Sequence, residues 1–168
     1  MSFARLYISG NVRRYHANPA MAHLGQSNAD HQGRCVQLLL ALHPGPSVAL
    51  IDAVAHHDVG EVDACDLSGP FKALHPELAA SHALIEADYL CATVGRDVMS
   101  GLHVVDKWWL GFIDKLEAFC FMLVHAPIER LYHGWPEARQ SLFDAAAVVP
   151  KLQDRVVELI LDLEARVW

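Results

Sequence analysis

Apolar residues in this chain recur three and four positions apart, in segments that glycine and proline separate from one another. No segment alternates apolar and polar residues over a convincing length, as a half-buried β-strand would. The spacing therefore predicts an all-α fold, with six or seven helices packed around one core. The expected helices are residues 3–15, 28–43, 48–58, 76–94, 104–124, 135–147 and 150–167.

The residues between these segments suggest how the helices begin and end. Asn28 and Ser47 are expected N-caps, because their side chains can accept a backbone N–H of the first turn. Pro76 suits the first position of the long helix, and Gly95 suits the left-handed position after its end. Residues 60–69 are expected to form a polar loop. The 168 residues correspond to one domain, 1–168.

Composition excludes several classes of protein. Apolar residues make up 53% of the chain and charged residues 20%, a balance typical of a chain with a packed core. The formal charge of −7 argues against a broad basic face for a nucleic-acid polymer. No run of 18 apolar residues occurs, so no membrane span is expected, and the first residues lack a signal-peptide pattern. The scattered cysteines contain no C-x-x-C pair and are expected to be reduced, in a cytoplasmic protein: Cys35, Cys65, Cys91 and Cys120.

The eleven histidines are the compositional anomaly. Most are interpreted as ordinary core or surface residues, but His31 and His57 have carboxylate neighbours. His57 and Asp58 are consecutive at the end of an apolar helix, and they can converge on one ion if that helix end tightens. Asp114 lies in a later apolar helix. In the same helix, the aromatic residues 108–112 are interpreted as core or interface rather than as a base-stacking platform.

The ordered set of His31, then His57-Asp58, then Asp114 resembles the HD-domain metal-dependent phosphohydrolases. The segment 57–72 narrows the resemblance to the 5′-deoxynucleotidase branch, which includes compact phage dATP triphosphohydrolases. Its pattern of HD-x-x-E-x-x-x-x-D-x-x-x-P-x-K is present here, and an Arg-aromatic pair precedes the first histidine. Two positions depart from the usual pattern: Asp30 stands where the family has Glu, and Tyr15 where it often has Trp.

The resemblance implies a role for each matched residue. The metal ligands would be two imidazoles and two carboxylates, a set that suits Mn, Fe, Co, Ni or Zn: His31, His57, Asp58 and Asp114. Glu61 and Asp66 would be catalytic, and they could also hold a second divalent ion. Substrate would be bound by Arg14, Tyr15, Lys72 and Asp66, with Asp66 on the deoxyribose hydroxyl.

The implied reaction is hydrolysis of a 2′-deoxynucleotide at its 5′ phosphate ester. A dNTP, dATP first, would yield a deoxynucleoside and triphosphate; the alternative is a 5′-deoxynucleotidase that releases phosphate from dNMPs. A non-enzyme alternative is a helical ligand-binding domain with a relic metal site. The resemblance also implies a homo-oligomer that acts on a small molecule in the cytoplasm, the host cytoplasm if the chain is phage-encoded. Neither a nucleic-acid polymer nor a membrane is an expected partner.

Overall fold

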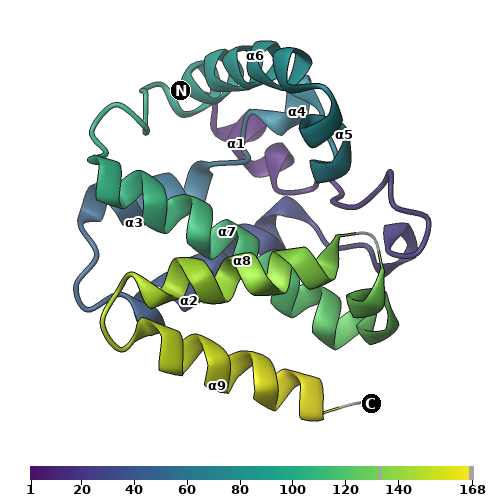
Figure 1. Ribbon diagram of the computed structural model, residues 1–168. Coiled ribbons are helices and arrows are strands. Elements are labelled where there is room, and N and C mark those ends of the chain that lie inside the picture. The colour runs from purple at the N-terminus through teal and green to yellow at the C-terminus, as the bar shows by residue number, and fades with distance from the viewer. Residues whose placement is uncertain (133, 167–168) are drawn as a thin grey trace.

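The computed structural model describes residues 1–132 and 134–166, and within them every regular element is helical (Figure 1). The all-α prediction is therefore confirmed. Residues 133, 167 and 168 lie outside the described residues, including the last position of the helix expected at 150–167. The elements are α1 (Phe3–Ser9), η1 (Ala22–Leu24), α2 (Asn28–Leu42), α3 (Val48–His56), α4 (Glu61–Ala64), α5 (Gly69–Leu74), α6 (Pro76–Val94), α7 (Val104–His125), η2 (Pro127–Leu131), α8 (Trp135–Ala147) and α9 (Leu152–Ala165), where η marks a 3-10 helix.

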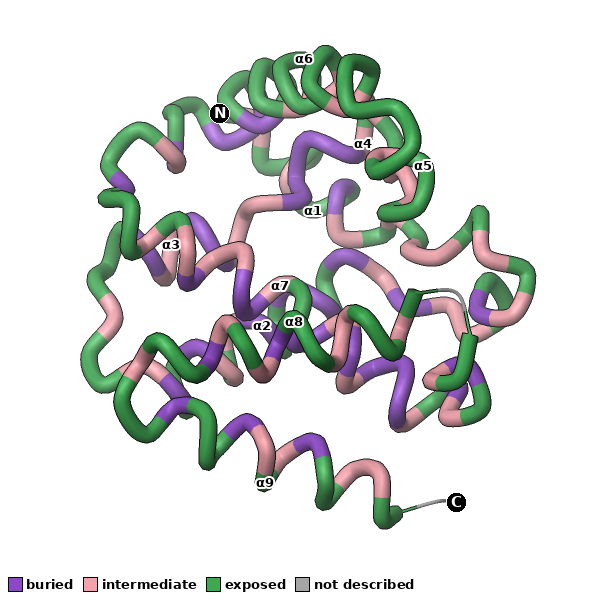
Figure 2. The backbone as a smooth tube through the Cα atoms, in the orientation of Figure 1, coloured by how far each residue is buried: buried purple, intermediate pink, exposed green. Residues whose placement is uncertain are grey.

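Helix α7 is the centre of the fold, because α2, α3, α8 and α9 all pack against it. Its apolar residues recur at helical spacing and form the middle of the main core: Trp109, Phe112, Ile113, Leu116, Phe119, Met122 and Leu123. The buried stretches of α2 and α7 lie together in Figure 2. Trp109 is buried in this core and stacks edge-on against His43 rather than facing a cavity, which agrees with the core interpretation of the aromatic segment.

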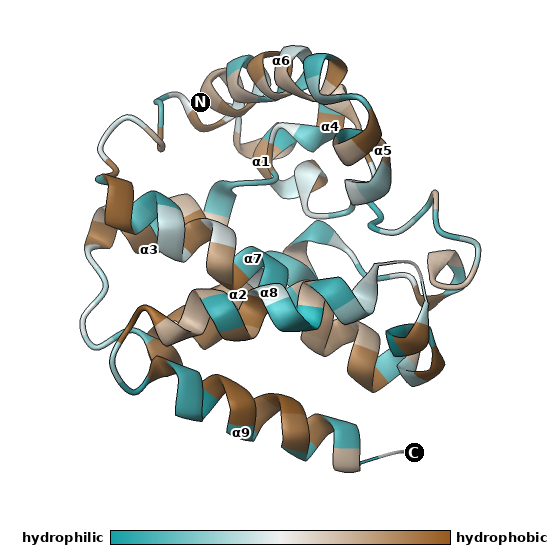
Figure 3. Ribbon diagram, in the orientation of Figure 1, coloured by the Kyte–Doolittle hydropathy of each residue, from teal (hydrophilic) through white to brown (hydrophobic). Residues whose placement is uncertain are grey.

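The last two helices extend the core on one side of α7. Helix α9 carries both hydrophobic and hydrophilic residues (Figure 3), and its buried residues Leu152, Val156 and Ile160 join the main core. Arg155 on α9 donates to the carbonyls of Ala41 at 2.7 Å and Leu42 at 3.4 Å. These are carbonyls that the end of α2 leaves without a helical partner. The C-terminal helix thus stabilises the helix that carries His31.

Helices α1, α4, α5 and α6 gather at the opposite end of the molecule from α9 (Figure 1). A second, smaller apolar cluster joins α1 and α6 to the turn before α4: Val59, Leu90, Val94 and Val98, with Leu6 packed against it. Helices α4 and α5 pack on α6. Helix α6 is exposed along most of its length (Figure 2). Gly60 allows α6 to approach closely, since a Cβ there would lie 2.2 Å from the backbone oxygen of Glu86. The chain between the two clusters contains His57 and Asp58.

Several expected boundaries were wrong. Ser27, not Asn28, caps α2, in a reciprocal capping box with Asp30, and Asn28 is the buried first residue of the helix. The first helix ends at Ser9 rather than at residue 15, because the chain turns after Gly10 and pairs Arg13 with Ser27. The expected caps at Ser47 and Gly95, and Pro76 as first residue of α6, are confirmed.

The segment 60–69 was expected to be a loop, but residues 61–64 form the short helix α4 and Gly69 begins α5. These two short helices raise the number of helices above the six or seven expected. Glu61 is the first residue of α4, and Ser68 caps α5 by accepting the backbone N–H of Phe71. No helix among the described residues combines the length and apolarity needed to cross a bilayer.

Candidate metal centre

Three parts of the fold bring two imidazoles and two carboxylates together: α2 supplies His31, the turn after α3 supplies His57 and Asp58, and α7 supplies Asp114. Nε2 of His31 lies 3.2 Å from Nε2 of His57 and 3.1 Å from Oδ1 of Asp114. The same nitrogen lies 3.5 Å from Oδ2 of Asp58. Nε2 of His57 is 3.4 Å from Oδ1 of Asp58 and 3.8 Å from Oδ1 of Asp114.

These separations suit a single cation. Two donors that each lie about 2.1 Å from an ion are about 3.0 Å apart at a right angle and about 3.4 Å apart at the tetrahedral angle. Three of the observed separations, 3.1, 3.2 and 3.4 Å, lie in this range, and the other two, 3.5 and 3.8 Å, are longer. Two imidazoles with two carboxylates favour a transition metal over Ca²⁺, which prefers a shell of oxygens. The residues present therefore fit a divalent transition-metal ion.

The turn after α3 explains how two consecutive residues can face the same point. The N–H of Val59 donates to the carbonyl of His56 at 3.0 Å, a spacing of three residues that tightens the helix end. The ring Nδ1 of His57 hydrogen-bonds to the carbonyl of Val54 at 2.9 Å. Because Nδ1 must carry the proton in that bond, Nε2 is the nitrogen that faces Asp58 and Asp114, and it offers a lone pair to a cation once its own proton is lost.

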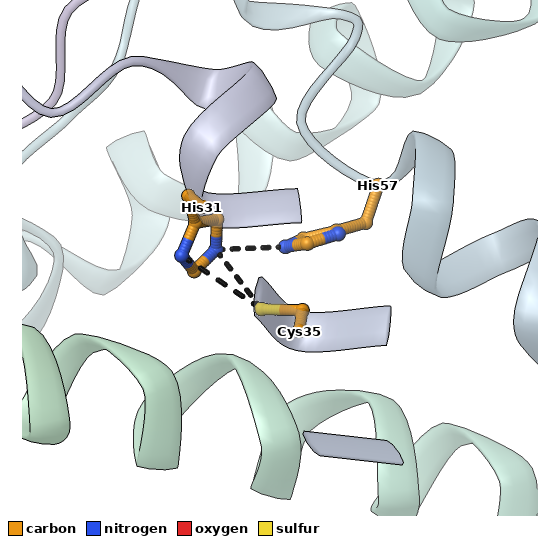
Figure 4. Close-up of side chains that lie close together, drawn as sticks. All are labelled: His31, Cys35 and His57. Atoms are coloured by element: carbon orange, nitrogen blue, oxygen red, sulfur yellow. Dashed lines mark hydrogen bonds between the residues drawn. The ribbon is translucent and has the colours of Figure 1, made fainter. Parts of the chain in front are cut away.

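Cys35 lies beside these donors, one turn after His31 on α2, and is fully buried. Its sulfur is 3.8 Å from Nδ1 and 3.6 Å from Nε2 of His31 (Figure 4). A sulfur almost equally far from both nitrogens of a ring cannot lie along the lone pair of Nε2, which points away from Nδ1. Burial also raises the pKa of the Cys35 thiol. We therefore interpret Cys35 as packing against His31 rather than as a ligand.

Arg14 is the positively charged side chain beside the four donor atoms. Its Nη1 donates to Oδ2 of Asp58, and its Nη2 lies 3.8 Å from Oδ1 of Asp114. Burial opposes its charge, but Asp58 and Asp114 outweigh that penalty and raise the pKa of Arg14 above its ordinary value. Tyr15 has a positive φ of 59°, and its ring stacks on Phe121 with centroids 5.7 Å apart. The Arg14 guanidinium lies over the same ring, 5.9 Å from its centroid. The two residues of the Arg-aromatic pair therefore both face α7.

The charges of the site also shift the ionisation of His57 and Asp114. Burial disfavours the protonated ring of His57, but the Asp58 carboxylate and the hydrogen bond with Asp114 outweigh it and raise the pKa of His57 to about 9. Burial disfavours the ionised form of Asp114, yet hydrogen bonds from His31 and His57 hold its pKa well below its usual range. Positive charge is thus stabilised where the four donor atoms meet.

Glu61 is buried next to the four donors, with a side chain only 4% exposed, so it is not the solvated loop residue that a polar loop would contain. The side-chain amide of Asn28 donates to Glu61 Oε2 at 2.8 Å and to the carbonyl of Asp58 at 3.1 Å. Burial, with Asp58 and then Asp66, raises the pKa of Glu61 to about 8. A carboxyl that can gain or lose a proton near neutral pH therefore lies beside the candidate metal centre.

Of the remaining expected residues, Asp66 and Lys72 are half-buried at the same end of the molecule as Glu61. Asp66 is close enough to raise the pKa of Glu61, while Lys72 opposes the rise that burial causes in the pKa of Glu86. The carboxylates that lie together are Asp58, Glu61 and Glu86, with oxygens within 4.8 Å of one another. Asp66 is not in that group. The expected pairing of Glu61 with Asp66 on a second ion stays a prediction, because the group of three carboxylates neither includes nor excludes that pair.

Sequence reasoning missed Glu117, Gln26 and Glu86, and it treated Asn28 only as a cap. A signal for Glu117 was present, since it follows Asp114 by three residues on an apolar helix and must share its face. Glu86 and Gln26 carried no such signal, because their places depend on how distant segments pack. Comparisons of this chain with protein-family models, with curated proteins and with solved structures found no match.

Proposed function

We propose that this chain is an HD-type, metal-dependent phosphohydrolase that cleaves 2′-deoxynucleotides at the 5′ phosphate ester. The proposal has two supports: the sequence pattern of the HD phosphohydrolases, and the meeting of His31, His57, Asp58 and Asp114 donor atoms at separations of 3.1–3.8 Å. The second carries the proposal, because the four ordered motif residues come from separate parts of the chain and their donor atoms meet at one point. The favoured reaction converts dATP to deoxyadenosine and triphosphate.

These four residues would hold a divalent cation, which would supply Lewis-acid chemistry: polarising a phosphoryl oxygen and lowering the pKa of a water molecule. The other residues then divide the remaining tasks of the hydrolysis. Water attacks the phosphorus next to the sugar, the bond from that phosphorus to O5′ breaks, and O5′ gains a proton as it leaves. Glu61 is the group that accepts the proton of the water and returns one to O5′, since its raised pKa suits both steps. Asp66 holds the 3′-hydroxyl of the deoxyribose, and Tyr15 lines the part of the site that binds this sugar.

Local positive charge must bind the substrate, because the chain has a formal charge of −7 and a triphosphate is strongly anionic. Arg14 is held between Asp58 and Asp114. A divalent cation neutralises these two carboxylates and leaves the guanidinium free to hold a phosphate in a forked geometry. Lys72 on α5 supplies a second positive charge at the same end of the molecule.

Arg14→Ala is expected to lower kcat/KM by roughly 10- to 150-fold, which corresponds to the loss of a charge-assisted hydrogen bond of about 1.5–3 kcal/mol. Bound metal should be unchanged, because Arg14 is not a ligand. Arg13→Ala is the matched control, since Arg13 is exposed and donates to the carbonyl of Gly25. Equal kinetics in the two variants would contradict a phosphate contact at Arg14.

Product analysis tests the function itself. The metal-loaded protein is incubated with dATP, the other dNTPs, dNMPs and ATP, and triphosphate is measured separately from orthophosphate. Triphosphate from dATP is the expected product, while orthophosphate from dNMPs alone would favour the 5′-deoxynucleotidase. ATP should react at least tenfold more slowly, because a site packed against C2′ buries an extra hydroxyl without a partner. No turnover of any substrate would reject the enzyme proposal.

The non-enzyme alternative is a helical binding domain with a relic metal site. A relic site has no need to keep a buried carboxyl such as Glu61 beside its ligands, because burying that group costs free energy in the folded state. Glu61 is buried, and Asn28 orients it. This arrangement favours an enzyme.

A further inference from the structure

Three buried polar side chains are hydrogen-bonded in a row: Gln26, Glu117 on α7 and His31 on α2. Glu117 on α7 is 2% exposed, and its Oε2 lies 2.5 Å from Nδ1 of His31. Its other oxygen, Oε1, accepts the side-chain N–H of Gln26 at 2.8 Å. His31 itself is completely buried. Both oxygens of the Glu117 carboxylate are therefore engaged within the protein interior, away from the four donor atoms.

This geometry determines which nitrogen of His31 is free. An ionised carboxylate only accepts hydrogen bonds, so Nδ1 must carry the proton that it donates to Glu117. The neutral ring then has its lone pair on Nε2, the nitrogen that lies 3.1 Å from Oδ1 of Asp114 and 3.5 Å from Oδ2 of Asp58. Without Glu117, the ring could place its proton on Nε2 and donate it to either carboxylate.

We propose that Glu117 is a positioning residue of the metal site: it holds His31 as the Nδ1–H tautomer and aims Nε2 at the cation. This inference rests on the metal site of the proposed function. Gln26 in turn fixes Glu117, since its amide holds the carboxylate oxygen that His31 does not use. Glu117 touches neither cation nor substrate and acts only through His31.

The test uses Zn²⁺ alone, with its dissociation constant measured on the full chain by competition with a chromophoric chelator. Glu117→Gln is expected to weaken zinc binding 10- to 100-fold, the range typical for partners of metal-ligating histidines. In a His31→Ala background, the same substitution should change the dissociation constant less than twofold, because Glu117 acts through that ring. A residue with a merely structural role would weaken binding equally in both backgrounds. Equal effects, or wild-type affinity in Glu117→Gln, would overturn the proposal.

A second measurement requires no substitution and therefore does not depend on whether the variants fold. Side-chain ¹⁵N chemical shifts of the metal-free wild-type protein report which nitrogen of His31 carries a proton. We expect a proton on Nδ1 of His31, and a neutral ring protonated on Nε2 alone would reject the role of Glu117. The two proposals fail differently: a wild-type chain that binds no zinc removes the metal site itself, whereas normal zinc binding with an indifferent Glu117 removes only this inference.

Discussion

Asp114→Ala is expected to abolish both bound metal and phosphate-ester hydrolysis. Its carboxylate contacts both imidazoles, at 3.1 Å from His31 and 3.8 Å from His57, so its removal takes away one ligand and the partner of two others. The side chain is 38% exposed and alanine favours helices, so α7 should fold normally. Metal affinity should fall by more than about 100-fold, the upper range for loss of an outer partner. Metal content per chain, zinc competition and product release measure the effect.

Cys35→Ser is the matched control for this prediction. The sulfur of Cys35 lies as close to the site as a ligand would, but it packs against the ring of His31. The variant should retain zinc and activity within about threefold, with a small loss of thermal stability from a buried hydroxyl. Loss of metal in Cys35→Ser, together with its retention in Asp114→Ala, would replace the proposed ligand set with one of His31, Cys35 and His57.

Glu61→Gln separates catalysis from binding. The amide fills the same space and can still accept the hydrogen bond from Asn28, but it can no longer gain or lose a proton near neutral pH. Metal content and nucleotide affinity should be unchanged, whereas the single-turnover rate should fall by about 10² to 10⁴-fold, as for a lost general acid–base group. Rapid-quench measurements with excess enzyme isolate this step from product release.

Asp63→Asn, on the same short helix, is the control for Glu61→Gln, since Asp63 pairs with Arg5 at the surface. Its single-turnover rate should equal that of the wild type. An unchanged rate in Glu61→Gln would end the proton-transfer role. Recovery of Glu61→Gln at high metal concentration would instead assign Glu61 to a second ion, in which case Glu86 and Asp58 are the carboxylates available to share it.

The helical spacing of apolar residues was sufficient to predict the all-α class and the long helices. The same reasoning was weakest where segments are short, because α4 has only four residues and its fold depends on packing against α6. Whether Glu61 is exposed or buried follows from that packing, so a local pattern could not decide it. The first helix was also predicted too long, since turns after Gly10 bring Arg14 and Tyr15 back to α7.

Some residues of the candidate site could be predicted from the sequence, and others could not. His31, His57, Asp58 and Asp114 were chosen from the order of a known motif, and the fold brings their donor atoms together. The tightened turn that consecutive residues 57 and 58 require was also foreseen on geometric grounds. Asn28, Gln26 and Glu86 depend on contacts between segments tens of residues apart, which a single sequence does not reveal.

Gly60 has a consequence for how this protein could diverge. Its backbone follows directly after the residues of the tightened turn and lies against the carbonyl of Glu86, with no room for a methyl group between them. The chain around residue 60 and the chain around residue 86 thus pack too closely to admit one more carbon atom. Most other side chains of α6 face solvent, apart from the buried Leu90, Thr93 and Val94, and can change more freely. No substitution of Gly60 leaves this contact unchanged, because even the single methyl group of alanine would force α6 away from the turn that holds His57 and Asp58.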